Sequence, residues 1–358
     1  MITKPRVMTR LLNNLILPIA TVIGLVGGVG LTFAEQMSMG AGAVVDPSLE
    51  SYLPTVGLKG RLIIVGSDSM QQLLSRFAGE FKKWYSGVTI SVETEGSLAS
   101  FDQFVEQSAP GRATAGDAVV ILASSLPLTP EETNRFTSAL GYPPLEVQIA
   151  LGAVAVYVHE SNPVRQLTLE QLDAMFSSTR KRGVAGDITR WGQVGLRGEW
   201  EQKPIHLYGR DKLSGTRALF NATALLNGEF KPSPKEEHDA NSVVLAVSND
   251  PLGIGYAGIL YKDYSFVKIV ALAEKPGAPF AFPTAEAVRR ETYPLGRKLY
   301  LYANKPPRGE LSPVVREYLE FAHSREGQEL VVVSGFIPLP VNLLDRNLAV
   351  LGKRQDTK

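Results

Sequence analysis

Short apolar runs alternate with amphipathic stretches over the first third of the chain. The run at 61–65 is followed by a polar loop and then by apolar residues at helical spacing from Met70 to Trp84. An alternating strand pattern at 88–92 and an apolar run at 118–122 repeat this order. Strands that are each followed by a loop and a helix predict a parallel α/β sheet, whose ligand crevice lies at the carboxyl ends of the strands.

A second group of strand and helix patterns follows a long β-rich run at 146–158, which is long enough to pass from one lobe to another. Thr168 and Gln171 have the spacing of a capping box, which predicts a helix from there to Phe176. The remaining elements are expected as strands at 205–208, 253–256 and 300–302 and as helices at 214–225, 313–321 and 326–333.

Hydroxyl side chains stand at or near the starts of four predicted helices. They are Ser69, Ser97, Ser124 with Ser125, and Ser214 with Thr216. A helix N-terminus carries unpaired N–H groups and about half a positive charge, so it attracts anions. Serine is also a favoured N-cap, which is the better explanation for any one of these residues alone. Their repetition at strand ends, with Arg210 just before Ser214, predicts an oxyanion site, because a guanidinium can make two hydrogen bonds to one anion.

The first 34 residues have the pattern of an export signal. Basic residues up to Arg10 precede an apolar stretch from Leu11 to Ala34 that contains no acid, and Thr32-Phe33-Ala34 is typical of a cleavage site. We expect cleavage after Ala34; a retained membrane anchor is the alternative, since about 20 apolar residues can span a bilayer. Either outcome exports the rest of the chain to the periplasm or another extracytoplasmic space. Residues 35–58 are expected to form a linker without a core of its own.

Composition removes several classes of function. The 358 residues include 37 basic and 36 acidic ones, and this balance disfavours nucleic-acid binding, which needs clustered Lys and Arg. The chain has no Cys and 4 His, so disulfides and thiolate metal sites are excluded, and neither a metal nor a cofactor is expected. The length favours two domains.

Histidine and tryptophan add little chemistry to this pattern. His206 is expected to be packed within a strand, and the other three histidines are expected at the surface. Trp84 and Trp191 are expected in the core rather than on a platform for stacking sugars. No catalytic residue is expected, because a serine nucleophile needs an adjacent base and the chain has no G-x-S-x-G motif.

The ordered motifs resemble those of the phosphate-binding proteins of Pst-type ABC transporters. The loops Gly66-Ser-Asp-Ser69, Gly96-Ser97 and Ala123-Ser-Ser125 look like the first three ligand loops of that family. The stretches that match further along the chain are Leu167–Phe176, Thr189–Gly195, Ile205–Arg210, Ser214–Phe220, Gly253–Gly258, Tyr293–Tyr300, Ser324–Gln328 and Ser334–Pro338. The resemblance therefore covers nearly all of the chain after the linker.

This resemblance implies an α/β, periplasmic-binding-protein-like type II fold, with two lobes joined by two crossing hinge strands that close on phosphate. It implies a first lobe at 59–150 plus 267–342, a second lobe at 151–266 and a C-terminal tail at 343–358. By position, the implied contacts with phosphate are Ser69, the backbone of Met70, Ser97, Ser125, Arg210, Ser214, the N–H of Gly215, and Thr216.

Two positions depart from the family pattern. Ser125 stands where some members have an Asp that accepts the proton of phosphate, although other members have Ser. Rejection of sulfate would then depend on backbone carbonyls or on another acid such as Asp68. The sequence Arg-Asp-Lys-Leu precedes Ser214 where a Gly is common, so that Asp211 would have to orient Arg210.

The leading hypothesis is thus an extracytoplasmic, monomeric binding protein that delivers inorganic phosphate to a membrane ABC permease. A binding protein or sensor for another tetrahedral oxyanion, such as sulfate, molybdate or phosphonate, stays open. A serine-dependent hydrolase is the alternative from another class, and it would need a base beside one of the serines.

Overall fold

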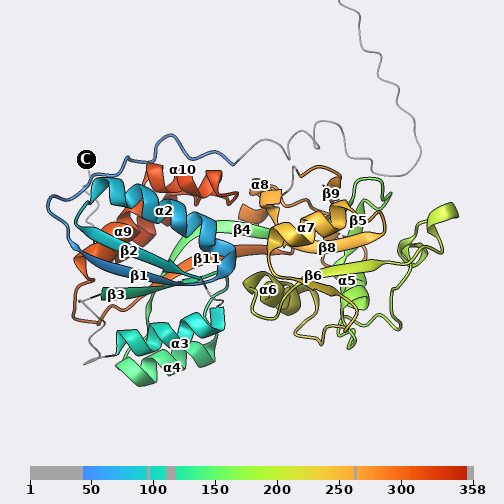
Figure 1. The fold of residues 1–358 in the computed structure, drawn as a ribbon, viewed down its shortest axis with the longest axis horizontal. Helices are drawn as coiled ribbons and strands as arrows, with labels where there is room; N and C mark the ends of the chain where they lie inside the picture. The colour runs from blue at the N-terminus through green and yellow to red at the C-terminus, as the bar shows by residue number, and fades with distance from the viewer. Residues whose placement is uncertain (1–42, 95–96, 110–117, 262–263, 353–358) are drawn as a thin grey trace, which may run out of the picture.

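The chain forms two α/β lobes, and strands pass from one lobe to the other between them (Figure 1). The computed structural model describes residues 43–94, 97–109, 118–261 and 264–352. The expected export signal at 1–34 lies outside these ranges. Within them, no helix combines the length and the apolar character needed to cross a bilayer.

The first lobe is built on the parallel strands that the apolar runs predict. Its elements are β1 (Gly60–Gly66), η1 (Asp68–Met70), α2 (Gln71–Trp84), β2 (Val88–Glu93), α3 (Ser97–Ser108), β3 (Ala118–Ser124), α4 (Pro130–Leu140), β11 (Gly296–Ala303), α9 (Pro313–His323), α10 (Arg325–Val333) and α11 (Val341–Val350). β1 pairs in parallel with β2 and β3. Because Leu62 packs with α2 and α9 whereas Ile63 packs with α3 and α4, β1 is buried on both faces and its run is continuously apolar.

The second lobe repeats this arrangement around β6. Its elements are β5 (Gln166–Thr168), α5 (Leu169–Phe176), η2 (Trp191–Val194), η3 (Gly198–Trp200), β6 (His206–Arg210), α6 (Gly215–Ala224), β7 (Lys235–Glu237), α7 (Ala240–Ser248), β8 (Gly253–Gly258), η4 (Ile259–Tyr261), β9 (Val267–Ile269), β10 (Ala271–Ala273) and α8 (Ala285–Arg289). β6 lies parallel to β7 and β8. The capping box is confirmed: Thr168 and Gln171 exchange hydrogen bonds of 2.9 and 3.2 Å at the start of α5.

β4 (Leu145–His159) and β11 are the two strands that join the lobes, as the resemblance implies (Figure 1). The first part of β4 pairs with β11, and from Val154 onward β4 pairs with β8 of the second lobe. The described strands of the main sheet follow the order β2-β1-β3-β11-β4-β8-β6-β7, and β9 also pairs with β4. The ligand-facing ends of β1 and β6 are therefore held on either side of one continuous hinge.

The chain returns to the first lobe later than the boundary that we expected at residue 267. β9 pairs with the end of β4 that lies in the second lobe, and β10 pairs with β5. Val288 and Leu295 also belong to the core of the second lobe, so the return falls at Gly296, where β11 begins. Strands of three residues carry too short a pattern for the sequence to reveal their partners.

The amphipathic stripe of α2 is buried as predicted, except at its last residue. Phe77 and Phe81 are fully buried, but Trp84, which we expected in the core, is 45% exposed. Tyr85 follows Phe81 by one helical turn and takes the buried position instead. The expectation for Trp191 is confirmed, since this side chain is fully buried.

Residues 43–58, which we call the N-terminal strap, pack against both lobes rather than forming a linker without a core: Leu49 belongs to the core of the second lobe and Tyr52 to that of the first. Tyr52 is buried, and its hydroxyl donates a 2.6 Å hydrogen bond to Glu317 of α9. Thr55 donates to the other oxygen of Glu317 at 2.5 Å, and the hydroxyl of Tyr85 donates to Glu317 at 3.0 Å. The polar composition of the strap hid these contacts, because they are made with residues more than 200 positions away.

The start of the expected C-terminal tail also belongs to the folded body. Residues 343–350 continue α11, where Leu344 is fully buried, and Leu351 is buried just after it. Asn347 donates a 2.7 Å hydrogen bond to the carbonyl of Gln148 in β4. α11 therefore supports the hinge strand.

Two histidines lie opposite to expectation. His206 begins β6, but its side chain is 45% exposed and its Nδ1 lies 2.6 Å from Asp250. His323, which we expected at the surface, is fully buried, and its Nδ1 lies 2.6 Å from the carbonyl oxygen of Leu319. Burial lowers the pKa of His323, so this ring is neutral at pH 7. His159 is half-buried, and His238 is exposed as expected.

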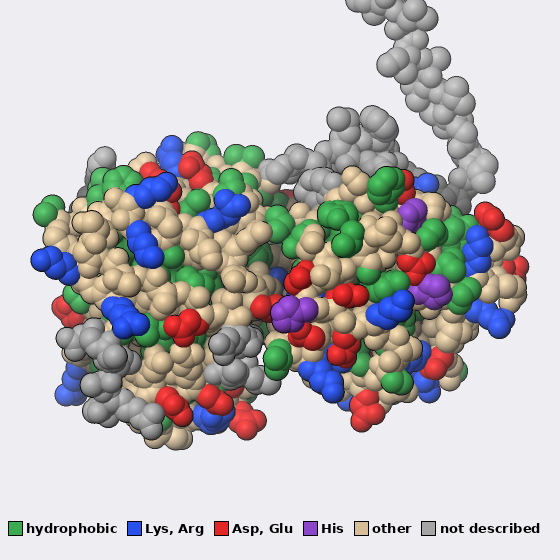
Figure 2. All heavy atoms as spheres, in the orientation of Figure 1, with side chains coloured by type: hydrophobic (Ala, Val, Ile, Leu, Met, Phe, Trp, Pro, Cys, Tyr) green, Lys and Arg blue, Asp and Glu red, His purple; other side chains and the backbone are tan. Residues whose placement is uncertain are grey.

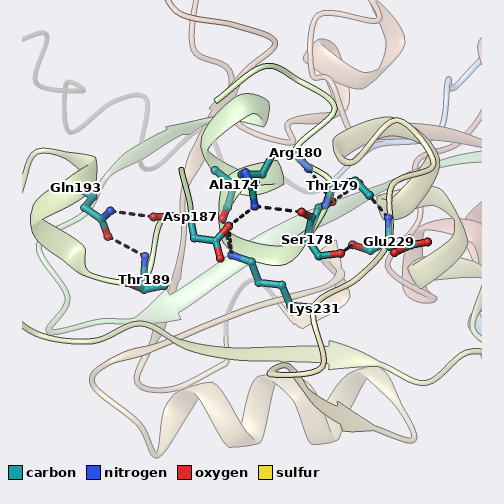
Figure 3. Close-up of polar contacts among 10 residues, drawn as sticks. Ala174, Ser178, Thr179, Arg180, Asp187, Thr189, Gln193, Glu229 and Lys231 are labelled. Carbon is teal, nitrogen blue, oxygen red and sulfur yellow. Dashed lines mark hydrogen bonds and ion pairs between the residues drawn. The ribbon is translucent and has the colours of Figure 1, made fainter. Parts of the chain in front are cut away.

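Loops at the far end of the second lobe are fixed by a polar network around Asp187 (Figure 3). Asp187 Oδ1 lies 2.5 Å from Arg180 Nη1 and 3.4 Å from Lys231 Nζ. Lys231 also donates to the carbonyl of Ala174 at 2.7 Å, and burial lowers its pKa. Because none of these residues lines the interlobe cleft, this network is structural.

Candidate functional site

A cleft of about 460 Å³ lies between the lobes, beyond the carboxyl ends of β1 and β6. In the space-filling view, a groove separates the two lobes, and acidic side chains and a histidine gather beside it on the second lobe (Figure 2). The polar residues that line the cleft include Asp68, Ser69, Arg210, Ser214, Thr216 and Arg297, together with Asp211, His238 and Asp239.

Arg210 is the last residue of β6 and enters the cleft from the second lobe. Its side chain is only 2% exposed. Nη2 donates a 3.0 Å hydrogen bond to the carbonyl of His238 and forms an ion pair with Asp68. The backbone carbonyl of Arg210 accepts a 2.8 Å hydrogen bond from Arg217, which fixes this end of the strand. Arg210 Nε is buried and makes no hydrogen bond to any described residue, so one donor of the fork is open.

Asp68, and not Asp211, is the carboxylate that meets Arg210. Asp68 lies in the first lobe, so this ion pair crosses the cleft. Asp211 instead accepts the N–H of Leu213 at 3.1 Å and lies 3.2 Å from His238. Our expectation for Asp211 is therefore wrong. The acid that pairs with Arg210 comes from the other lobe, so its position along the sequence does not reveal it. Asp68 Oδ1 is buried without a hydrogen-bond partner among the described residues.

The start of α6 forms the rest of the second wall. Ser214 is the N-cap residue, and its side chain accepts the N–H of Thr216 at 3.2 Å. Gly215 is the first residue of the helix, and both it and Thr216 are buried. The N–H groups of this first turn have no partner within the helix, so α6 directs donors and the positive end of its dipole toward the cleft.

The first lobe contributes a chain of hydroxyls from two strand ends. Ser67 Oγ lies 3.0 Å from Ser69 Oγ and 3.2 Å from Ser125 Oγ. The loop can approach β3 this closely because residue 66 is Gly: a Cβ there would lie 2.0 Å from the carbonyl oxygen of Ala123. Neutral hydroxyls thus face the charged donors of the second lobe.

Arg210, Ser69, Ser214 and Thr216 line the interlobe cleft. The other four residues expected from the sequence are Met70, Ser97, Ser125 and Gly215. The N–H of Met70 donates to the carbonyl of Ser67 at 3.0 Å and is engaged within its loop. Ser125 is fully buried and lines a neighbouring cavity of about 790 Å³. Gly215 begins α6 as expected. Ser97 begins α3, but its side chain lies outside the described residues.

Ser124 and Ser125 were expected near the start of a helix, but α4 begins only at Pro130. Its N-cap is Thr129, which forms a capping box with Glu132. Ser124 donates to the carbonyl of Leu126 at 2.7 Å and shapes the intervening loop. Ser125 can therefore contribute its hydroxyl but no helix dipole.

Sequence reasoning missed Arg297, the second residue of β11. This side chain is buried at the cleft, and its Nη1 lies 3.4 Å from Ser69 Oγ. Burial lowers the pKa of Arg297 to about 10, which still leaves the guanidinium charged at pH 7. Strand alternation puts Arg297 on the same face as Leu299, whereas Lys298 is exposed on the other face, and a charge at this apolar position was the signal that could have identified Arg297.

The polar groups of the cleft can be compared with what metal binding and serine activation require. Among the cleft residues that the structure describes, no group of three His, Asp or Glu side chains could hold a metal ion. His238 lines the cleft, but it faces Asp211 and its side chain is 96% exposed. The Ser214 hydroxyl meets a backbone N–H rather than a base. The geometry therefore suits binding of an anion better than activation of a serine.

Comparisons with known proteins agree on one family. A family model described as PBP superfamily domain matches residues 53–326. The phosphate-binding protein PstS of Pseudomonas aeruginosa is 39% identical over 324 residues, which cover 90% of this chain and 97% of that protein. Protein SphX of Synechococcus elongatus is 27% identical over 277 residues, or 77% of this chain and 76% of SphX.

Solved structures share the same fold. An ABC-type phosphate transport receptor from Vibrio cholerae has a TM-score of 0.61 and 23% identity, over 78% of this chain and 100% of that one. PstS from Borrelia burgdorferi has a TM-score of 0.54 and 20% identity, over 79% of this chain and 100% of that one. At this level of identity, the likeness establishes the two-lobed architecture.

Proposed function

Because this chain belongs to the PBP superfamily, and within it to the PstS-type phosphate-binding proteins, we propose that it captures inorganic phosphate between its lobes and delivers it to an ABC permease. The proposed role is binding and delivery, with no chemical step. The relatives that support it match over most of their own length, so the proposal concerns the whole chain rather than one part of it.

The observation that carries this proposal is the convergence of anion donors from both lobes on one cleft. Arg210 and the N-terminal turn of α6 approach from the second lobe, and Ser69 approaches from the first. Such a combination of guanidinium, helix dipole and hydroxyls favours a compact oxyanion. The ligand contacts that we propose are Ser69, Met70, Ser97, Ser125, Arg210, Ser214, Gly215 and Thr216.

Asp68 supports phosphate over sulfate. Its Oδ1 is a buried acceptor without a partner among the described residues, and it lies beside the anion donors. Phosphate near neutral pH carries a proton that can be donated to this oxygen, whereas sulfate has none and would meet a like charge. Asp68 would then perform the role that Ser125 cannot perform as a neutral hydroxyl.

The lobes already meet through the ion pair between Arg210 and Asp68, and the cleft still has more space than one phosphate ion needs. About 460 Å³ corresponds to roughly fifteen water molecules at their liquid volume, far more than one phosphate ion needs. Motion about β4 and β11 is the hinge closure typical of two-lobed binding proteins. The closed form would then be the one that the permease recognises.

The protein is proposed to act outside the cytoplasm. Residues 1–34 carry the pattern of an export signal, and phosphate capture on behalf of a permease requires access to the external solution. Removal of this segment would release the binding protein, and retention would tether it to the membrane that holds the permease.

Calorimetric titration of the purified chain with phosphate, arsenate, sulfate and molybdate tests the proposal. We expect one phosphate per chain with micromolar or tighter affinity, about −8 kcal/mol or more favourable. Arsenate should compete with phosphate, and sulfate should bind far more weakly. No heat with phosphate alongside clear heat with sulfate would contradict the assignment.

A further inference from the structure

Arg297 occupies an unusual place for a charged residue. It lies in β11 opposite Gly152 of β4, next to the point where the chain crosses between the lobes. Its Nε lies close to the backbone of Gly152: a Cβ placed there would be in ordinary contact with Nε at 3.4 Å and would lie 3.1 Å from the Phe336 ring.

This cation lacks the partners that normally accompany a buried arginine. No carboxylate of the described residues lies within ion-pair distance of Arg297, although Asp68 attracts its charge from farther away, and Arg297 Nε makes no hydrogen bond to the described residues. Arg297 Nη1 donates a 3.4 Å hydrogen bond to the hydroxyl of Ser69, and Ser69 lines the cleft. A buried and unpaired charge is costly, and a bound anion is the kind of partner that offsets such a cost.

The charge of the cleft explains why a second arginine is needed. Arg210 already pairs with Asp68, and Asp211 and Asp239 line the same cleft, so the carboxylates there more than offset the charge of Arg210. Arg297 lines the same cleft and adds positive charge to it. Its contact with Ser69 and its place in the lining of the same cleft let it reach a ligand that both lobes hold.

We propose that Arg297 is a second anion-binding arginine, which supplies further positive charge to the site from the hinge strand. This inference rests on the proposed phosphate function and adds a residue to that site. It further predicts that an apolar residue at position 297 leaves the ligand-free protein at least as stable, because replacing a buried charge with a well-packed apolar side chain is often neutral or stabilising.

The test compares Arg297→Met, Arg297→Lys and the parent, using the full chain and inorganic phosphate. Arg289→Met is the matched control, because Arg289 is an exposed arginine of α8 that lines the neighbouring cavity but not the cleft. Phosphate affinity is measured by calorimetry at two salt concentrations, and the thermal midpoint is measured without phosphate.

We expect Arg297→Met to weaken phosphate binding by about 30-fold or more and to reduce its salt dependence, while the ligand-free midpoint stays equal or rises. Arg297→Lys keeps the charge and should recover part of the affinity, and Arg289→Met should match the parent.

Phosphate affinity of Arg297→Met within threefold of the parent would overturn the inference and leave the proposed function intact. An Arg297→Lys protein that binds as weakly as Arg297→Met would likewise overturn it, because charge would then not be what position 297 supplies. A parent that binds no phosphate would overturn the proposed function itself. These outcomes separate the two claims.

Discussion

Two carboxylates of the first lobe differ in how many hydrogen-bond partners they have. Asp68 lies in the cleft, and Glu317 of α9 lies against the N-terminal strap. Glu317 is hydrogen-bonded on both oxygens, by Tyr52 and Tyr85 on Oε2 and by Thr55 on Oε1, at 2.5 to 3.0 Å. Asp68 meets Arg210 through Oδ2, while its Oδ1 has no partner among the described residues.

The difference separates a structural carboxylate from a binding one. Burial raises the pKa values of Tyr52 and Tyr85, so both hydroxyls stay protonated and keep donating to Glu317. Both oxygens of Glu317 are engaged within the protein, and the N-terminal strap is held in place. An acceptor left open in a buried site carries a cost that a ligand proton can remove.

Removing Arg210 should have the largest effect on phosphate binding. Arg210→Ala leaves both the anion and Asp68 without the guanidinium, and we expect phosphate binding to weaken by about 2 to 5 kcal/mol. Arg210→Lys should recover part of the loss, because an ammonium keeps the charge but not the planar fork. Calorimetric titration with phosphate measures both variants.

Arg190→Ala is the control for this measurement, since Arg190 is an exposed arginine of the second lobe that lies outside the cleft. It should bind phosphate like the parent. Parent-like affinity in Arg210→Ala would mean that the anion binds somewhere else.

Changing Glu317 should affect stability and leave the cleft untouched. Glu317→Gln removes the charge that three hydroxyls stabilise, so we expect the free energy of unfolding to fall by about 1.5 to 3 kcal/mol, the scale for a hydrogen bond to a charged group. Urea denaturation measures this loss. Glu329→Gln, an exposed change on the neighbouring α10, should cost little.

Phosphate affinity of Glu317→Gln should equal that of the parent. A loss of phosphate affinity larger than the difference between the parent and Glu329→Gln would show that the N-terminal strap is coupled to the cleft. Glu317 would then not be a purely structural carboxylate.

Local patterns predicted those parts of the site that depend on neighbours in the sequence. The strand at 205–208, the helix after Ser214 and the capping box at Thr168 were all visible as residue spacing, and the structure has them in place. N-caps and strand ends are decided within a few residues, so the second wall of the cleft could be located before the fold was known.

Partners that are distant in the sequence could not be predicted. Asp68 and Arg210 are 142 positions apart, Ser69 and Arg297 are 228 apart, and Tyr52 and Glu317 are 265 apart. Which charge meets which depends on how the lobes face each other, and a single sequence carries no record of that pairing. Asp211 was therefore chosen for its proximity to Arg210, and it was the wrong acid.

Neutralising Asp68 should change selectivity more than stability. In Asp68→Asn, the amide oxygen can still face Arg210, which turns the NH₂ group toward the ligand as a donor. Sulfate then gains a donor and loses a like charge, so we expect the ratio of phosphate to sulfate affinity to fall about tenfold or more, about 1.4 kcal/mol. Titration with both anions measures the ratio, and Asp211→Asn is the matched control. An unchanged ratio would exclude Asp68 as the acceptor.

Ser125 should show the smallest effect of the series. Its hydroxyl is fully buried and lies 3.2 Å from Ser67 Oγ, but Ser67 is also within 3.0 Å of Ser69. Ser125→Ala therefore leaves the hydroxyl chain of the first lobe with one pair intact, and it removes no charge. We expect phosphate affinity to fall by less than about 1 kcal/mol, within the range for one neutral hydrogen bond. Calorimetry on Ser125→Ala beside Ser69→Ala decides the order. If Ser125→Ala weakens phosphate binding more than Ser69→Ala does, the anion lies nearer the end of β3 than the interlobe cleft places it.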